Sequence, residues 1–262
     1  MTAVKSTRDA DNIVTLTLDL PGRSMNVLNE HLMRPFGEEM EKALKDTSVK
    51  GVIITSGKEA FIAGADLEMI YAITDPQVVV DMVTQMHALL RAIEKCGRPV
   101  VAALNGTALG GGLEIALACH WRIAINDPKT KFGQPEVKLG IAPGYGGTQR
   151  LPRLVGKGIA LQLILSAEMI DAQEAYRIGL VNKVVPAADL LVESEKMLRG
   201  ILAMAPLAIR LCLEAVDQGI EMTLDEGLLL EANHFGLLAA THDMKEGTTA
   251  FLEKRPAHFE GR

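Results

Sequence analysis

Short apolar runs alternate with helical patterns in the first two thirds of the chain, and this alternation restricts the possible fold more than any other feature. The runs are rich in β-branched or small apolar residues, which is typical of strands covered on both faces. A run, a helical crossover and a second run, in that order, predict parallel strands joined by helices. The sequence therefore predicts an α/β fold. The expected strands span 51–55, 99–104 and 121–125, and the expected helices span 66–72, 76–96 and 111–119.

Two further elements precede these segments, and the character of the chain changes after Gly140. Residues 12–18 alternate apolar and polar side chains, which predicts a half-buried strand. Asn29 is a good N-cap for a helix that runs through Leu44. After Gly140 the sequence predicts five helical stretches, interrupted by one strand-like run at 181–185.

The change of character along the chain predicts two parts. We expect an α/β core over residues 1–200 and a helical region over residues 201–262. The last helices carry apolar faces, with Leu224, Leu228 and Phe235 among them, and little chain is left to cover these faces. We therefore expect the helical region to pack on other subunits.

Composition excludes several classes of protein. The chain has 27 Lys and Arg against 33 Asp and Glu, a net charge of −6, which argues against a nucleic-acid partner. No apolar run approaches the roughly 20 residues of a membrane span, and residues 1–11 are too polar for a secretory signal. The three cysteines form no C-x-x-C pair, and the six histidines show no ligand spacing. We therefore expect a cytoplasmic protein without membrane contact and without a tightly bound metal.

Two loops that follow buried strands are the best candidates for a ligand site. Ligands of open parallel sheets bind at the carboxyl ends of the strands. The loops span 60–66 and 105–114, and each opens a helix whose first N–H groups lack partners and favour negative charge. The glycines at 110–112 let a ligand approach the backbone, and a tight turn without a ligand is the alternative. The glycine stretch is not a dinucleotide-binding fingerprint or a P-loop, and the chain has no serine-hydrolase elbow.

Two glutamates could work with these amides. Glu114 lies one helical turn beyond Gly111, so its carboxylate returns toward the second loop. Glu136 lies in a segment rich in glycine. Taken alone, each is more simply a glutamate that compensates a helix dipole or faces solvent. Together, the amides could stabilise an oxyanion such as a thioester enolate, while the carboxylates hold a water and move protons as general base and general acid.

Four motifs stand in order along the chain, namely FIAGADL at 61–67, NGTALGGGLE at 105–114, FGQPE at 132–136 and LGIAPGYGGTQRL at 139–151. They resemble the enoyl-CoA hydratase/isomerase family, the crotonase superfamily, and the likeness runs nearly from end to end. The resemblance implies a crotonase-like spiral of ββα units with a C-terminal helical trimerisation region, in a homotrimer or a dimer of trimers. It implies an acyl-CoA thioester as the substrate and no separate cofactor, since coenzyme A is part of the substrate.

By position, the resemblance places the two thioester-binding amides at Ala65 and Gly111 and the two catalytic glutamates at Glu114 and Glu136. The presence of both glutamates favours an enoyl-CoA hydratase, a lyase of fatty-acid β-oxidation that converts trans-2-enoyl-CoA to 3-hydroxyacyl-CoA. We expect Glu114 to position the water and Glu136 chiefly to serve the proton at C2, with the roles open to sharing.

Coenzyme A is polyanionic and this chain is acidic overall, so local cations must meet its phosphates. Arg23 resembles the position that touches the nucleotide in the family, and Lys254 and Arg255 are expected to contribute from a neighbouring subunit. Solvated surface charge is the alternative for all three. The other residues expected to bind the substrate or its coenzyme are Ala63, Asp66, Leu67, Glu68 and Gly144.

Two other kinds of function stay open at this point. A double-bond isomerase, or a ring or C–C hydrolase acting on an acyl-CoA, would use the same two amides, and product analysis with crotonyl-CoA would separate these reactions. A non-catalytic paralogue that binds RNA or has a structural role is the alternative outside enzymes, and the acidic net charge opposes RNA binding. The length of the acyl chain is open as well.

Overall fold

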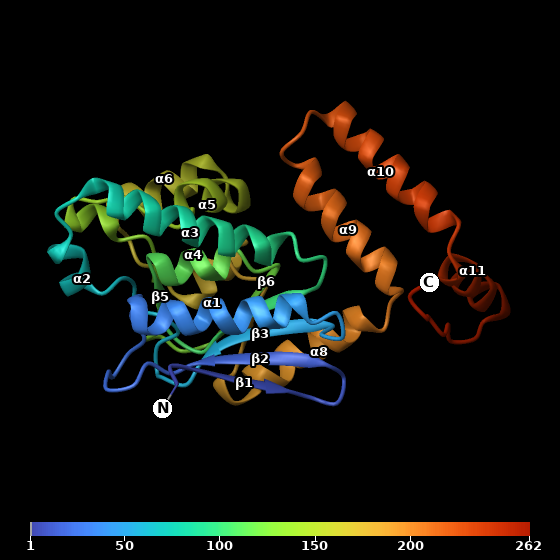
Figure 1. Ribbon diagram of the computed structural model, residues 1–262, viewed down its shortest axis with the longest axis horizontal. Helices are drawn as coiled ribbons and strands as arrows, with labels where there is room; N and C mark the ends of the chain where they lie inside the picture. Colours follow the sequence, from blue (N-terminus) through green and yellow to red (C-terminus); the bar gives the residue numbers. More distant parts are fainter. Residues whose placement is uncertain (1) are drawn as a thin grey trace.

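The computed structural model describes residues 2–262 as an α/β fold around a six-stranded sheet (Figure 1). The strand order is β1-β2-β3-β4-β6-β8, in which β1 pairs with β2 antiparallel and the other neighbours pair in parallel. Two very short strands, β5 and β7, form a second, parallel sheet. The strands span Val4–Arg8 (β1), Ile13–Leu18 (β2), Gly51–Ser56 (β3), Val100–Leu104 (β4), Ala108–Leu109 (β5), Trp121–Ile125 (β6), Phe132–Gly133 (β7) and Lys183–Val185 (β8).

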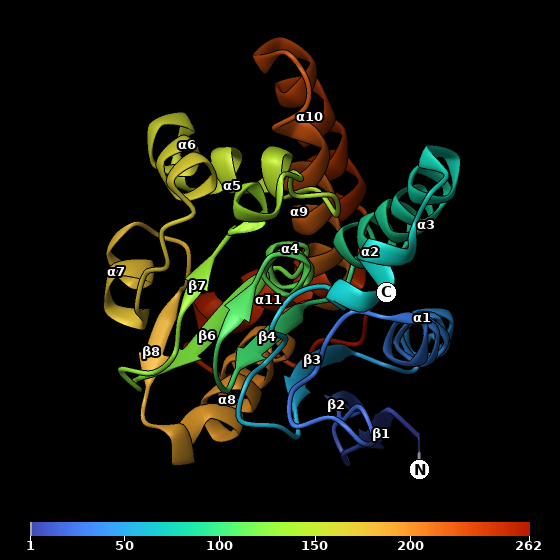
Figure 2. The same cartoon turned by 90° about the vertical axis from the view of Figure 1, so that its left-hand side faces the viewer.

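Helices cover both faces of the six-stranded sheet, and successive residues of a strand alternate between two apolar cores. Ile53 and Val101 face the smaller core, where Leu198 of α8 lies with them. Their neighbours Val52 and Val100 face the larger core on the opposite side, as the two-residue period of a strand requires. Figure 2 shows α8 on one side of the sheet and α4 on the other. The helices of this part span Glu30–Lys45 (α1), Leu67–Ala72 (α2), Pro76–Glu94 (α3), Gly111–Leu117 (α4) and Leu190–Leu202 (α8).

The predicted α/β fold is confirmed, and the parallel strands lie close to their expected bounds. Asn29 caps α1 as predicted, since its side chain accepts a hydrogen bond from the N–H of Leu32. Strand β1 was not expected. Its first residue, Val4, is buried and the rest are exposed, so this edge strand lacks the apolar run that identifies an interior strand.

The structure corrects the expected number of helices after Gly140. Seven α-helices, rather than five, follow that residue in the described chain. Gly156, with φ of 84°, separates α5 from α6, and Ala167, with φ of 50°, ends α6. Thr223 begins α10 with a capping box. Each of these backbone breaks separates two helices that the hydrophobic pattern alone would predict as one. Besides α8, the helices are Gly147–Val155 (α5), Lys157–Ser166 (α6), Ala172–Arg177 (α7), Pro206–Gly219 (α9), Leu224–Ala239 (α10) and His242–Glu253 (α11).

Helices α9, α10 and α11 project from the rest of the molecule (Figure 1). Helix α8 packs on the sheet, so the projecting part begins after it, at Pro206. Large apolar side chains on these helices are exposed, among them Leu224, Phe235 and Phe251. None of the helices in residues 2–262 combines the length and the apolar character needed to cross a membrane.

Candidate active site

A cavity of about 280 Å³ lies where the segments that follow β3, β4 and β7 meet. The loop after β3 contributes residues 63–65, the segment before α4 contributes residues 109–111, and the segment after β7 contributes Glu136 and its neighbours. An isolated β-bridge joins Ile62 to Ala108, and β5 pairs with β7. The structure thus brings the two loops and the Glu136 segment to one place.

The N–H groups of Ala65 and Gly111 belong to residues that line this cavity. Gly111 is the first residue of α4, so its N–H has no partner within the helix. Ala65 lies in a parallel bridge with Leu28, which bonds to the residues on either side of Ala65 and not to Ala65 itself. Within residues 2–262, neither N–H donates to a backbone carbonyl. Both are therefore available to bind an oxygen atom in the cavity.

The glycines before and at the start of α4 are required by the backbone and by packing. Gly110 has φ of 53°, a conformation that favours glycine. A Cβ on Gly111 would lie 2.4 Å from Cδ1 of Leu28, and one on Gly112 would lie 2.6 Å from the carbonyl oxygen of Ile62. The glycine stretch therefore forms a tight turn and also lets α4 approach the first loop closely.

Glu114 is almost completely buried, with 1% of its surface exposed. Its Oε1 accepts a hydrogen bond from the N–H of Gly147 at 2.6 Å. Burial raises the pKa of Glu114 to about 7, and the negative charge of Glu136 adds to this, while the N–H groups of Gly147 and Tyr145 oppose it. Glu114 is not a lining residue of the 280 Å³ cavity, but its carboxyl group lies close enough to Glu136 for the charge of Glu136 to raise its pKa.

Glu136 begins a short 3-10 helix, Glu136–Leu139, and lines the cavity. Burial raises the pKa of this carboxyl group above its ordinary value. Its Oε1 lies 2.9 Å from where a Cβ on Gly110 would be, so the side chain rests against the turn before α4. With its amide oriented to satisfy its neighbours, the fully buried Gln134 donates to Oε1 and Oε2 of Glu136 at 2.9 and 3.2 Å. Gln134 was not expected from the sequence, because nothing in the pattern indicates a buried amide there.

Arg23 lies beside the expected coenzyme-binding residues of the first loop. It pairs with Asp66 at 3.3 Å and with Glu68 at 3.5 Å, and half of its side chain is exposed. Asp66 caps α2, and a hydrogen bond from Asn29 is the main reason that the pKa of Asp66 is lowered. Ala63 and Leu67 both line the cavity, Ala63 from the loop after β3 and Leu67 as the first residue of α2. The structure therefore brings most of the expected coenzyme-binding residues together.

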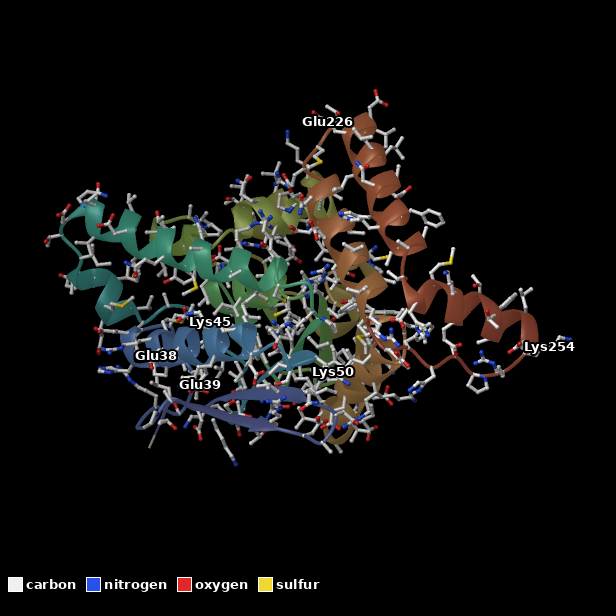
Figure 3. The ribbon with its side chains drawn as sticks, turned by 45° about the vertical axis from the view of Figure 1, so that its right-hand side comes forward. Glu38, Glu39, Lys45, Lys50, Glu226 and Lys254 are labelled. Carbon is white, nitrogen blue, oxygen red and sulfur yellow. The ribbon has the colours of Figure 1, made fainter. Side chains whose placement is uncertain are left out.

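Three expected residues lie elsewhere in this chain. Gly144 is not a lining residue of the 280 Å³ cavity, and its carbonyl oxygen lies 2.8 Å from Nε2 of His87. Lys254 lies at the far end of the projecting α11 (Figure 3). Its neighbour Arg255 is already paired with Glu246. Within one chain, neither Lys254 nor Arg255 is placed at the cavity.

The residues of the site suit an oxygen-containing organic ligand better than a metal ion. In the described part of the chain, no three His, Cys, Asp or Glu side chains gather as metal ligands do. The arrangement can bind a carbonyl oxygen through two amides and transfer protons through two carboxyl groups.

Comparison with known proteins relates the whole chain to one family. The family model described as enoyl-CoA hydratase/isomerase matches residues 8–262. The chain is 45% identical to the crotonyl-CoA hydratase of Syntrophomonas wolfei, with 95% of each chain covered. It is 42% identical to the 2,3-dehydroadipyl-CoA hydratase of Escherichia coli, with 95% of this chain and 96% of that one covered.

The likeness extends to three dimensions. The crystal structure of an enoyl-CoA hydratase from Bacillus anthracis matches with a TM-score of 0.91 and 36% identity, over 99% of this chain and 100% of that one. The similarity in sequence and in structure thus spans nearly the whole chain. The chain belongs to the enoyl-CoA hydratase/isomerase family.

Proposed function

We propose that this protein adds water across the 2,3 double bond of a trans-2-enoyl-CoA and forms a 3-hydroxyacyl-CoA. The observation that carries the proposal is the pair of buried carboxyl groups, Glu114 and Glu136, beside a cavity lined by the free N–H groups of Ala65 and Gly111. Full-length similarity to hydratases supports the same reaction and an enzyme of the hydro-lyase class.

The two amides bind the thioester oxygen in the proposed mechanism. Negative charge develops on this oxygen when the nucleophile attacks C3 and an enolate forms. Because the N–H groups of Ala65 and Gly111 are held by the backbone before the substrate arrives, they stabilise that charge without reorganising. Loss of one such donor typically costs about 2.7–4 kcal/mol of transition-state stabilisation.

The two glutamates hold the water and transfer the protons. Glu114 accepts a proton from the water as its oxygen bonds to C3, and Glu136 delivers a proton to C2 of the enolate. Proton exchange between the two carboxyl groups then restores the starting state. A pKa of about 7 lets Glu114 exist in both forms near neutral pH, and the raised pKa of Glu136 helps it to carry a proton.

Coenzyme A, in this proposal, lies along the first loop. Arg23 meets the nucleotide, and Asp66, Leu67 and Glu68 shape the pocket mostly through their backbone. Ala63 and Gly144 contact the substrate, and Lys254 contributes from a neighbouring subunit. The reaction needs no separate cofactor, because the thioester is activated by its own carbonyl group.

The proposed active form is a homotrimer or a dimer of trimers. Residues 1–200 form the catalytic core, and residues 201–262 pack on neighbouring subunits. The exposed apolar side chains of α10 and α11 support this packing. The acidic net charge fits the absence of a nucleic-acid partner. Similarity to bacterial hydratases supports a cytoplasmic location and a role in β-oxidation.

Hydration of crotonyl-CoA, followed by loss of the enoyl absorbance and by product analysis, tests the proposal. We expect the wild type to form 3-hydroxybutyryl-CoA. Glu114→Gln and Glu136→Gln should each abolish most of the turnover while the thioester still binds. Glu38→Gln, on the exposed side of α1, is the matched control and should keep full activity. Normal turnover by both active-site variants would overturn the assignment, and a product other than the 3-hydroxyacyl-CoA would indicate an isomerase or a hydrolase.

A further inference from the structure

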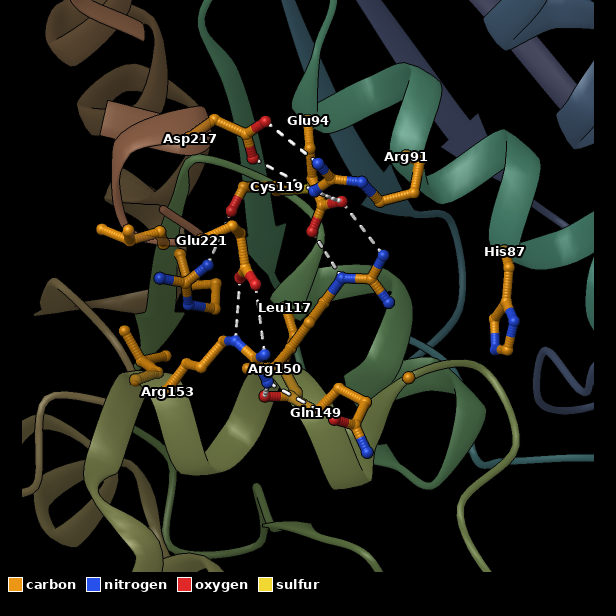
Figure 4. A pocket seen from close by; sticks show the side chains of 14 residues that line it. His87, Arg91, Glu94, Leu117, Cys119, Gln149, Arg150, Arg153, Asp217 and Glu221 are labelled. Carbon is orange, nitrogen blue, oxygen red and sulfur yellow. Dashed lines mark hydrogen bonds and ion pairs between the residues drawn. The ribbon is translucent and has the colours of Figure 1, made fainter. Parts of the chain in front are cut away.

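A chain of ion pairs connects the C-terminal helices to the loop that bonds to Glu114. It lies along a cavity of about 540 Å³ bounded by α3, α4, α5 and α9 (Figure 4). The ion pairs run from Arg150 to Glu94, from Glu94 to Arg91 and from Arg91 to Asp217. The cavity shares no lining residue with the 280 Å³ cavity of the candidate active site. The polar side chains that line the 540 Å³ cavity are therefore separate from the residues that line the 280 Å³ cavity.

Arg150 holds the loop at 144–147 in place. Its Nη1 donates to the carbonyl oxygen of Tyr145 at 2.8 Å. Its guanidinium lies directly against Gly146, where a Cβ would be 2.0 Å from Nη1. The N–H of the next residue, Gly147, donates to Oε1 of Glu114 at 2.6 Å. Arg150 thus fixes the peptide unit that precedes the one bonded to Glu114.

Glu94 holds Arg150 in turn. Its carboxylate oxygens accept hydrogen bonds from Nε and Nη2 of Arg150 at 2.5 and 3.1 Å. The side chains of Arg150 and Glu94 are only 14% and 15% exposed, so water competes little for these bonds. Bidentate pairs of this kind fix orientation as well as distance.

The support continues to the C-terminal helices. Arg91 donates to Glu94 at 2.6 Å and to both carboxylate oxygens of Asp217, in α9, at 3.1 Å. Arg91 is more exposed than Arg150, so its bonds are weaker constraints. An effect on the loop should therefore decrease from Arg150 to Glu94 and then to Asp217.

We propose that Arg150, held by Glu94, is a positioning residue for hydration, which fixes the loop so that the Gly147 N–H keeps the Glu114 carboxyl group in its working orientation. This inference rests on the proposed function. The segment 144–147, which ends at the first residue of α5, needs such support because its residues 144, 146 and 147 are glycines, which restrict the backbone least.

Arg150 also acts on Glu114 through its charge. The groups that face Glu114 are Glu136, which raises its pKa, Arg150, which lowers it, and Tyr145, whose own raised pKa keeps its hydroxyl neutral. Loss of the positive charge at Arg150 therefore raises the pKa of Glu114 further. The carboxylate form that accepts the proton of water then appears only at higher pH.

The test compares Arg150→Gln with Arg153→Gln in the full-length protein. Arg153 lies in the same helix and makes its own bidentate pair, with Glu221, but it makes no bond to the loop. Measured as crotonyl-CoA hydration, Arg150→Gln should lower kcat about 10- to 100-fold. Its KM should change less than about twofold, and the acidic limb of its kcat–pH profile should move to higher pH. Arg153→Gln should change none of these.

Two further variants separate position from charge. Arg150→Lys keeps the charge and loses the planar fork, so kcat should fall while the acidic limb stays in place. Glu94→Gln releases Arg150 without touching the loop, so kcat should fall less than in Arg150→Gln. If Arg150→Gln does not fold, Glu94→Gln and Arg150→Lys carry the same comparison with Arg153→Gln.

The proposal is overturned if Arg150→Gln keeps the wild-type kcat and pH profile, or if Arg153→Gln loses as much activity. It is also overturned if Arg150→Gln affects only KM. A wild type that hydrates no enoyl-CoA would instead refute the proposed function. An active wild type with an equally active Arg150→Gln would refute the positioning role alone.

Discussion

A single proton at Glu114 is subject to opposing influences. Burial and the charge of Glu136 favour the protonated form, whereas the N–H of Gly147 and the charge of Arg150 favour the carboxylate. Burial dominates, and the pKa rises from 4.5 to about 7. The carboxyl group of Glu114 therefore titrates near neutral pH, because the fold excludes water from it.

Protonation of Glu114 should make the folded state depend on pH. Since its pKa is higher in the folded than in the unfolded state, the folded state binds more protons between about pH 4.5 and 7. The contribution is fully present below 4.5 and is lost as the pH rises through 7. We expect the stability of the wild type relative to Glu114→Gln to fall by about 3 kcal/mol across this window.

Urea unfolding of the two proteins at a series of pH values measures this difference. Glu38→Gln, on the exposed side of α1, serves as the control and should follow the wild type at every pH. A constant difference between the wild type and Glu114→Gln would mean that Glu114 keeps an ordinary pKa.

At the residue scale, the sequence is informative where a residue stands at a fixed spacing from a backbone feature. The position of Glu114 one turn after Gly111 predicts that it lies near the loop, and the structure places it there. Gln134 and Arg150 could not be assigned in this way. Their roles depend on contacts with Glu136 and Tyr145, which are set by the packing of separate segments rather than by spacing.

Helix α4 packs closely on neighbouring segments because its first residues lack side chains. Its first two residues are glycines because the helix starts against Leu28 and Ile62. This close approach brings the first N–H of α4 to the cavity and points the next turn of the helix toward the loop that bonds to Glu114. The helix is entirely buried, so its amphipathic pattern is weak and its position is set by packing.

Alanine substitutions in two helices should differ in their effect on stability. Gly112→Ala puts a Cβ 2.6 Å from the backbone oxygen of Ile62, so α4 must shift, and we expect a loss of about 1–3 kcal/mol of stability. Hydration activity should fall with it. Gly158→Ala, in α6, meets nothing within 4 Å and should be neutral or stabilising by up to about 1 kcal/mol.

Thermal unfolding of both variants, with activity measured below the transition, makes the comparison. Equal Tm values for Gly112→Ala and the wild type would show that there is space for a Cβ at position 112, and would contradict the close packing of α4 on Ile62.

The interior strands and the main helices of the core are predictable because each has a strong apolar pattern. Strand β1 is not, since its edge position leaves most of it in water. The helices after Gly140 are hard to count because their breaks, at Gly156 and Ala167, are single residues with positive φ. A hydrophobic pattern reports which face is buried, but not where a backbone reverses.

At the scale of the whole molecule, the core and the C-terminal helices differ in how well their apolar side chains are buried. The core buries its apolar residues on both sides of the sheet, whereas α10 and α11 leave large apolar side chains in water. Phe251 is 85% exposed. The sequence predicts this exposed surface because the last helices carry apolar faces, with Leu224, Leu228 and Phe235 among them.

Charges placed on this surface should dissociate the proposed oligomer. We expect Phe251→Glu combined with Leu252→Glu to lower the mass measured by light scattering, while the fold of the core is retained. Val78→Glu, at a half-exposed apolar position in α3, is the control and should leave the mass unchanged. A wild type that is monomeric, or a double variant of unchanged mass, would contradict the proposed packing.

A crystal structure with butyryl-CoA bound shows where the thioester oxygen and the two acidic side chains lie. This saturated thioester has no double bond to hydrate, so it should remain intact in the site. We predict its thioester oxygen at about 2.7–3.2 Å from the nitrogens of both Ala65 and Gly111, with Glu114 and Glu136 flanking C2 and C3. A thioester oxygen bonded to neither nitrogen, or an acyl chain directed away from both glutamates, would contradict the account.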